Sequence, residues 1–158
     1  MYLNKHCFNG LCRYNAKGQF NTPFGQYTTN YFPEKELGFF YQKSRSAVFE
    51  HADFVHTMKK AKAGDIVYCD PPYVPLSKTA NFTSYSAGSF NESQQILLAN
   101  TAAELAAKKI TVIISNHDTE FTRAIYKEAT LYAFAVSRFI SSDVTTRGKA
   151  AEILAVFR

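Results

Sequence analysis

The sequence predicts an α/β domain whose sheet ends in an antiparallel hairpin. The stretch 65–70 is interpreted as a buried strand, and 110–115 is nearly all apolar, as a strand of a parallel sheet covered on both faces requires. A helical pattern over 91–109 separates them, so the order is strand, helix, strand. Two more apolar runs, at 131–140 and 152–158, flank a polar turn and complete the sheet as a hairpin. With 158 residues and 46% apolar side chains, the chain can bury a core of ordinary size.

Composition excludes disorder as the main state and argues against a membrane protein. The chain holds 14 Phe and 10 Tyr, far more aromatic rings than a solvated chain carries. No apolar run approaches the ~20 residues that cross a bilayer, and the first residues lack the pattern of a signal peptide. Three cysteines are an odd count, which favours a reducing compartment, so we expect a cytoplasmic protein with no membrane partner.

The cysteines also bear on metal binding. Cys7 and Cys12, with His6 beside them, make a zinc site conceivable. Zinc usually takes four protein ligands, and no second Cys or His pair completes the set, so we expect no metal. Cys69 lies in the apolar run 65–70 and is interpreted as a small buried side chain.

The segment 1–31 differs from the rest of the chain in charge and in side-chain type. It contains three basic residues and no acid, whereas the remainder has 15 basic and 13 acidic residues. Because Arg reads guanine, amides read adenine and flat rings stack on bases, the segment suits a surface that reads DNA bases. A solvated hairpin that happens to lack acids is the equal alternative. The residues concerned are Lys5, Arg13, Lys17, Tyr2, Tyr14, Tyr27, Tyr31, Asn4, Asn9, Asn15, Asn21 and Asn30.

A hairpin is expected within this segment. Two short runs flank Ala16-Lys17-Gly18, where Gly18 can take the positive φ of a tight loop. Pro23 and Gly25 interrupt the second run, which predicts an edge or protruding ribbon. Beyond it, Pro33 suits the first position of a helix over 33–44, and 47–50 is interpreted as a short strand.

Two further helices are expected from their capping residues. Asp53 can cap a helix over 54–61, which Gly64 closes. Asp118 or Thr119, after the strand 110–115, can cap a helix that ends near residue 128.

The most informative motif is Asp70-Pro71-Pro72-Tyr73, directly after the predicted strand. Ligands of open α/β sheets bind outside the carboxyl ends of the strands, so the motif stands where a site is expected. The Asp70 carboxylate and the Pro71 carbonyl are two acceptors on a stiff backbone, and an exocyclic amine has two protons to donate. Tyr73 offers a flat face on which a flipped-out base can stack. A plain Pro-Pro turn is the alternative, but the strand before and the helix after the motif favour a functional site.

Four stretches together resemble the DNA adenine methylase (Dam) family: FNGLCRYNAKGQFNTPFGQY, YCDPPYVPLSKTANFTSY, ISNHD and SSDVTTR. The family transfers methyl from S-adenosylmethionine to N6 of adenine, typically in GATC. The resemblance implies a partial Rossmann-like methyltransferase sheet, preceded by part of a DNA-recognition domain, with double-stranded DNA as partner. It makes Asp70, Pro71, Pro72 and Tyr73 the catalytic residues, and Asp70 also a contact of the cofactor.

The same resemblance implies roles for residues of the first segment. Arg13 would read guanine, while Leu11 and Pro23 would pack near the thymine methyl. Phe8 would wedge into the duplex when the base leaves. The other implied DNA contacts are Asn9, Asn15, Tyr27 and Ser77.

One departure from the family pattern changes the expectation for this chain. The Gly-rich F-x-G-x-G turn that cradles S-adenosylmethionine is missing. We therefore expect the C-terminal part of a bacterial or phage enzyme, with residues 1–31 a remnant of the recognition domain and 32–158 the C-terminal part of the catalytic domain. A separate N-terminal half is then an expected partner. Three interpretations stay open: methyl transfer by a longer or assembled enzyme, a DNA-binding module without catalysis, and a non-functional fragment.

Weaker expectations attach to polar residues around the motif. His117 is interpreted as a satisfied polar neighbour, and Asp118 as a cap rather than a catalyst. The loop after the motif resembles the family's cover over the target base, with a solvated loop as the near-equal alternative, and the last turn could hold phosphates or be simply solvated. These residues are Ser77, Thr79, Asn81 and Tyr85 on the loop, and Arg147 and Lys149 in the turn.

Overall fold

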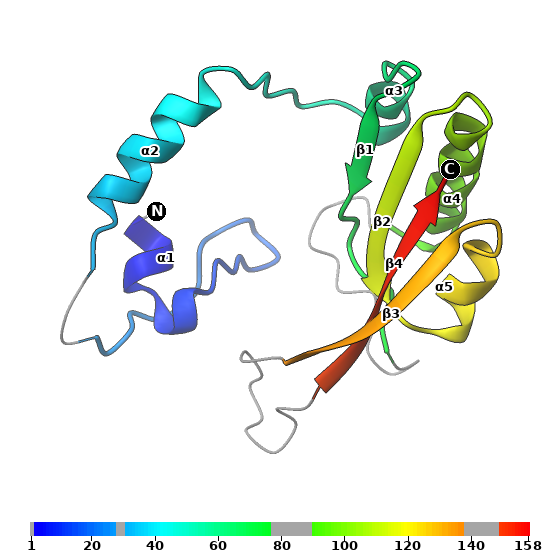
Figure 1. The fold of residues 1–158 in the computed structure, drawn as a ribbon. Helices are drawn as coiled ribbons and strands as arrows, with labels where there is room; N and C mark the ends of the chain where they lie inside the picture. Colours follow the sequence, from blue (N-terminus) through cyan, green and yellow to red (C-terminus); the bar gives the residue numbers. More distant parts are fainter. Residues whose placement is uncertain (1, 28–30, 77–89, 138–148) are drawn as a thin grey trace. The chain divides into compact units, whose positions relative to one another are not determined.

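The computed structural model describes residues 2–27, 31–76, 90–137 and 149–158 (Figure 1). The chain divides into two compact units, Met1–Glu50 and His51–Arg158. None of the helices among the described residues is both long enough and apolar enough to span a membrane. The functional division predicted at residue 31 stays a prediction, because the compact units are defined by contacts alone.

The first unit begins with a short helix that the sequence analysis did not predict. This helix, α1 (Tyr2–His6), is followed by a single 3-10 turn, η1 (Phe8–Gly10). The expected hairpin is present as a ribbon held by two isolated antiparallel bridges, Cys7 with Phe24 and Tyr14 with Phe20. Gly18 has φ +73° at its tip, a conformation that costs glycine little, so the predicted tight loop is confirmed.

Helix α2 (Glu34–Ser44) confirms the helix expected after Pro33, which occupies its N-cap position. None of its residues is buried within the described structure. The strand expected at 47–50 is wrong, since Val48 and Phe49 are 86% and 76% exposed and no described segment pairs with them. A short apolar run becomes a strand only if a neighbour supplies its hydrogen bonds, and a run by itself does not show that a neighbour exists.

The second unit is built on a mixed sheet of four strands. These are β1 (Ile66–Cys69), β2 (Thr111–His117), β3 (Thr130–Ser137) and β4 (Lys149–Phe157), in the order β1-β2-β4-β3. Strand β2 is parallel to β1, whereas β4 is antiparallel to both β2 and β3 (Figure 1). The predicted α/β sheet with a final antiparallel hairpin is therefore confirmed, and β4 rather than β3 lies against β2.

Three helices accompany the sheet: α3 (Phe54–Met58), α4 (Glu92–Ala106) and α5 (Glu120–Ile125). The side chain of Asp53 caps α3 as expected, by accepting from two backbone N–H groups of the first turn. That helix ends earlier than predicted, at Met58, and Gly64 takes φ +94° in the turn before β1 instead of closing the helix. Asn91 caps α4 in the same way as Asp53 caps α3.

The core lies on one face of the sheet, where α4 packs against β2 and β4. Its fully buried members include Leu98, Ala102, Val112, Ile114, Ile153 and Phe157. On the opposite face, Ile66 and Tyr68 of β1 are 70% and 61% exposed. The strand at 65–70 was expected to be buried, and this is wrong for the face that carries Ile66 and Tyr68. Alternate side chains of a strand point to opposite faces, and no helix among the described residues of this unit covers the face that carries Ile66 and Tyr68.

Candidate active site

The candidate site forms where the parallel strands β1 and β2 end side by side. Asp70 to Val74 follow the last residue of β1, and Ser115, Asn116 and His117 are the last three residues of β2. The pairing of Cys69 with Ile114 brings these two segments to the same edge of the sheet. The structure therefore places the predicted Asp-Pro-Pro-Tyr motif beside the polar end of β2.

Asp70 is exposed, yet its carboxylate is oriented by a neighbour on β2. The hydroxyl of Ser115 donates to Oδ1 of Asp70 at 2.8 Å. The phenol of Tyr68 in turn donates to the Ser115 hydroxyl at 3.2 Å. Two hydroxyl groups thus form a short chain that ends on the carboxylate.

The backbone after Asp70 is held by side chains of α4 and β2. The Gln95 amide donates to the carbonyl of Pro72 at 2.7 Å. The N–H of Val74 donates to Oδ1 of Asn116 at 2.9 Å, and Nδ1 of His117 lies 2.6 Å from the carbonyl of Val74. Because a carbonyl only accepts, Nδ1 of His117 carries a proton in this contact.

Behind the motif, these contacts join a fully buried polar network. The amide nitrogen of Asn116 donates to Oε1 of Gln95 and to the phenol oxygen of Tyr126, both at 3.1 Å. All three side chains have no exposed surface. Burial raises the pKa of Tyr126 to about 12, so its hydroxyl stays neutral at physiological pH.

Tyr73 is partly buried and lies edge-on to His117. The ring centroids are 4.9 Å apart and the ring planes meet at 84°. Burial raises the pKa of Tyr73, and a hydrogen bond with Ser115 opposes that rise. The edge contact fixes the orientation of the aromatic ring that the motif contributes.

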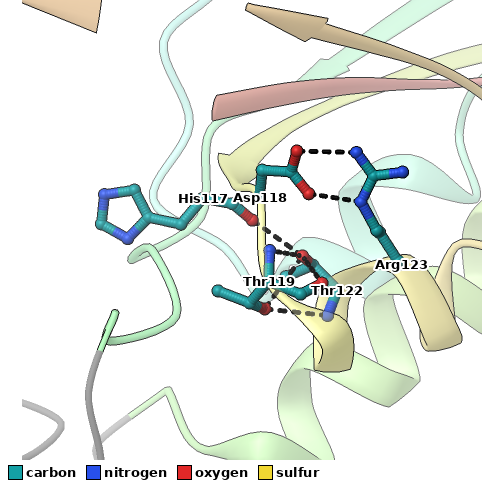
Figure 2. Close-up of polar contacts among 5 residues, drawn as sticks. All are labelled: His117, Asp118, Thr119, Thr122 and Arg123. Carbon is teal, nitrogen blue, oxygen red and sulfur yellow. Dashed lines mark hydrogen bonds and ion pairs between the residues drawn. The ribbon is translucent and has the colours of Figure 1, made fainter. Parts of the chain in front are cut away.

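Asp118 does not cap the next helix, which corrects one of the two capping expectations. Thr119 is the cap: its hydroxyl accepts from the N–H of Thr122, as Figure 2 shows. Asp118 instead receives two hydrogen bonds from Arg123, at 2.6 and 2.7 Å, and this contact lowers the pKa of its carboxyl group. The His117 ring points away from this pair (Figure 2), so Asp118 belongs to the helix start and not to the motif.

The first unit carries the residues expected to contact DNA. Phe8, Asn9, Leu11, Arg13, Asn15, Pro23 and Tyr27 are all exposed. The guanidinium of Arg13 is oriented by Asn21, because Nε donates to its side-chain oxygen at 3.0 Å and Nη2 to its carbonyl at 3.1 Å. Oδ1 of Asn15 accepts from the N–H groups of Lys17 and Gln19, so part of this side chain shapes the loop.

Several sequence predictions fall on residues that the structure does not describe. Ser77, Thr79, Asn81, Tyr85 and Arg147 lie outside the described residues, and the side chain of Lys149 does too. Among the described residues, no three potential ligands gather around a metal position. Cys69 packs against the core but is only partly buried, and this burial raises the pKa of its thiol to about 11.

Sequence reasoning missed the side chains that hold the motif. Gln95 was not singled out, and Ser115 and Asn116 entered only as part of the stretch ISNHD. The available signal was an amide inside an otherwise apolar strand, because a buried amide needs partners. The pattern could not name those partners, which come from elements 21 and 42 residues away in sequence.

Comparison with known proteins shows the class to which this site belongs. A sequence profile of the D12 class N6 adenine-specific DNA methyltransferases matches residues 1–139. The chain belongs to this family, and the resemblance seen in its motifs is confirmed.

Three individual relatives show how similar the chain is to particular members of this family. The chain is 52% identical over 159 residues to a DNA adenine methylase of Serratia marcescens, covering 100% of this chain and 59% of the relative. It is 49% identical over 158 residues to the DNA adenine methylase of Escherichia coli K12, covering 100% of this chain and 57% of the relative. For the Haemophilus influenzae DNA adenine methylase the identity is 48%, over 99% of this chain and 55% of the relative. The chain thus spans less than three fifths of the length of these relatives.

Proposed function

We propose that this chain supplies the amine-binding and DNA-reading parts of an enzyme that methylates N6 of adenine in GATC sites of double-stranded DNA. The observation that carries the proposal is the motif Asp70 to Tyr73, held at the carboxyl end of β1 by side chains of β2 and α4. Such a preset acceptor pair suits an exocyclic amine. The family membership and the relatives named DNA adenine methylase support the same reaction.

The chemical task is to make a poor nucleophile reactive. The lone pair of the adenine amino group is delocalised into the purine ring. Hydrogen bonds from its two protons to Asp70 and to the Pro71 carbonyl would favour the tetrahedral amine, whose lone pair is localised. Stacking of a flipped-out adenine on Tyr73 would fix the direction of that lone pair. Catalysis would then rest on positioning and electrostatics, and the proton would leave the amine after methyl transfer.

The described residues fit only part of the implied cofactor, S-adenosylmethionine. Asp70 offers an acceptor at the right edge of the sheet, as expected for a cofactor contact. Gly10, Gly18, Gly25, Gly38 and Gly64 all precede β1, so none of these described glycines forms a turn after a strand of the sheet. The cofactor supplies an electrophilic methyl group when bound, and we propose that most of its contacts come from a further polypeptide segment.

The edge and the open face of the sheet support such a segment. Strand β1 is an edge strand of the described sheet, and parallel sheets are usually covered on both faces. The open face of this unit carries Ile66, Tyr68, Tyr132 and Phe134, all more than 40% exposed. A segment equivalent to the unmatched two fifths of the relatives would extend this partial Rossmann-like sheet and cover its apolar face.

DNA reading is proposed for the exposed ribbon of the first unit. A guanidinium has five N–H donors, and Asn21 engages two of those of Arg13. The remaining donors are held in a fixed plane, as bidentate contact with guanine requires. Phe8, Leu11 and Pro23 are exposed apolar side chains, suited to wedging between bases and to contact with a thymine methyl.

The catalytic proposal is tested by single-turnover methylation of a GATC duplex. The chain is combined with the segment of the Serratia marcescens relative that it lacks, and S-adenosylmethionine is added. Asp70→Asn should lower the rate by at least about 100-fold while DNA affinity is retained. Asp65→Asn, just before the opposite end of the same strand, is the matched control and should methylate at the parent rate. Methylation by Asp70→Asn at close to the parent rate would contradict the mechanism.

The DNA-reading proposal is tested by binding. Arg13→Ala should reduce the preference for GATC over a duplex with the guanine replaced, by about 1–3 kcal/mol of discrimination. Lys17→Ala removes the same charge at the tip of the ribbon and should leave the preference unchanged. An Arg13→Ala variant with the parent's preference would show that another residue reads the guanine.

A second function is favoured by one specific observation. The residues of the ribbon that are expected to contact DNA are all exposed, and this surface does not depend on methyl transfer. A DNA-binding protein without catalysis would bind GATC duplexes selectively and transfer no methyl group, even with the complementing segment. The same methylation assay therefore separates the two functions.

A further inference from the structure

We propose that Ser115 is a positioning residue that sets the direction of the Asp70 carboxylate, with Tyr68 acting through it. The inference rests on the proposed function, because it assigns Asp70 to the target amine. It concerns the geometry of the acceptor and adds no new chemical step.

The hydrogen-bond geometry decides where the Ser115 proton goes. Its oxygen lies 2.8 Å from Oδ1 of Asp70 and 3.3 Å from the carbonyl oxygen of Cys69, and the phenol of Tyr73 is a further hydrogen-bond partner. One hydroxyl has one proton, and the closer, charged acceptor takes it. Ser115 is therefore the donor to the Asp70 carboxylate among the described residues, and Oδ1 is engaged before any substrate arrives.

Tyr68 completes the arrangement from the neighbouring strand. Its hydroxyl lies 3.2 Å from the Ser115 oxygen, which accepts from it while donating to Asp70. Hydrogen bonds that run in one direction polarise each other, so the Tyr68 contact strengthens the Ser115 contact.

The consequence for the amine follows from the two oxygens of a carboxylate. Ser115 engages Oδ1, so the second oxygen is aimed in one direction and can accept from the substrate. An exposed aspartate without this contact would sample several rotamers, and only some of them would face the amine. Ser115 itself is 4% exposed and its backbone is fixed by β2, so its hydroxyl holds the Asp70 carboxylate from a fixed position.

Two variants and a control separate an effect on the orientation of Asp70 from an effect on folding. Ser115→Ala removes the donor but keeps the strand, and Tyr68→Phe removes only the hydroxyl of a side chain that is 61% exposed. Thr101→Val is the control, because it removes a buried hydroxyl that donates to the Leu97 carbonyl within α4. All variants are made in the full chain with the complementing segment.

The rate and the affinity should respond differently. Ser115→Ala should slow single-turnover methylation by about 10- to 100-fold, as misplacement of a reacting group does. Its DNA dissociation constant should stay that of the parent. Tyr68→Phe should slow transfer by about 2- to 10-fold. The double variant should be no slower than Ser115→Ala alone, since Tyr68 acts through Ser115.

A measurement that does not depend on methylation tests this inference separately from the proposed function. Three-bond NMR couplings of Asp70 report its χ1 rotamer in the full chain without DNA. The parent should show one rotamer, Ser115→Ala an average of several, and Thr101→Val one rotamer. If Asp70 behaves so but the parent transfers no methyl group, the proposed function fails and the positioning role stands. If Asp70 keeps one rotamer in Ser115→Ala, or if that variant methylates at the parent rate, the positioning role is overturned.

Discussion

Removal of the Asn116 side chain should unfold the second unit more readily than any other single polar deletion near the motif. Asn116 has no exposed surface and makes four hydrogen bonds, to the N–H groups of Val74 and His117 and to the side chains of Gln95 and Tyr126. Asn116→Ala leaves these partners in a site that water does not reach. The unmet groups, rather than the lost bonds, set the size of the effect.

The size of this loss follows from the number of buried groups that cannot find another hydrogen-bond partner. The Tyr126 hydroxyl can rotate and His117 lies next in the chain, so two groups remain: the Val74 N–H and Oε1 of Gln95. Each buried group without a partner costs about 1–3 kcal/mol. The vacated space adds up to about 1 kcal/mol. We expect the free energy of unfolding to fall by about 2–7 kcal/mol, a large part of the roughly 5–15 kcal/mol of an ordinary domain.

Urea unfolding of the full chain, followed by circular dichroism, measures this change. Thr101→Val is the control, since its hydroxyl donates to a helix carbonyl and its removal should cost less than about 1 kcal/mol. Gln95→Ala should be strongly non-additive with Asn116→Ala, because the two share one hydrogen bond. A loss for Asn116→Ala no larger than that of the control would refute the view that this network stabilises the unit.

Three further predictions follow from other sites. Burial raises the pKa of the Cys69 thiol to about 11, so its alkylation by iodoacetamide at pH 8 should be about 100-fold slower than that of an ordinary exposed thiol. Peptide mass spectrometry measures the rate of labelling, and rapid labelling of Cys69 would contradict the prediction. Arg123 lowers the pKa of the Asp118 carboxyl, so its contribution is present above the ordinary value of about 3.9 and is lost as the pH falls through the lowered value. Urea midpoints of the parent and Arg123→Gln should accordingly differ at pH 7 and converge well below pH 4; equal midpoints at pH 7 would contradict this. Gly18→Ala should loosen the ribbon, because φ there is +73°, whereas Gly38→Ala in α2 should raise helicity. Hydrogen exchange should show weaker protection of the ribbon in the first variant, and circular dichroism should show more helix in the second. Effects of the same sign on stability would count against the backbone argument.

Local signals predicted most of the elements of the second unit. The predicted cap Asp53 stands at the start of α3, since a side chain that satisfies orphan N–H groups is a local property. The apolar run at 110–115 became β2 because the pattern of a covered strand is equally local. The run at 47–50 failed because a strand depends on a neighbour, and no local pattern names one.

The candidate site was predictable to the same extent. Asp70 to Tyr73 could be found from the motif and the strand before it, whereas the residues that hold the motif could not. Asn116 and Gln95 meet only after the chain has folded, so their roles depend on the register of β2 against the helix. Asp118 and Thr119 are adjacent and both able to cap, and Asp118 instead forms an ion pair with Arg123, one turn into the same helix.

The two prolines of the motif explain why buried amides surround it. Pro71 and Pro72 have no N–H, so the first backbone donors after Asp70 belong to Tyr73 and Val74. Because the two prolines cannot donate, few backbone hydrogen bonds can form within the segment, and its buried peptide groups need partners elsewhere. Gln95, Asn116 and His117 provide them from side chains, on the Pro72 carbonyl and on both peptide groups of Val74. The prolines and the buried network therefore act together. The prolines limit the backbone conformations that the loop can adopt, and the buried side chains select the one that leaves Asp70 at the surface.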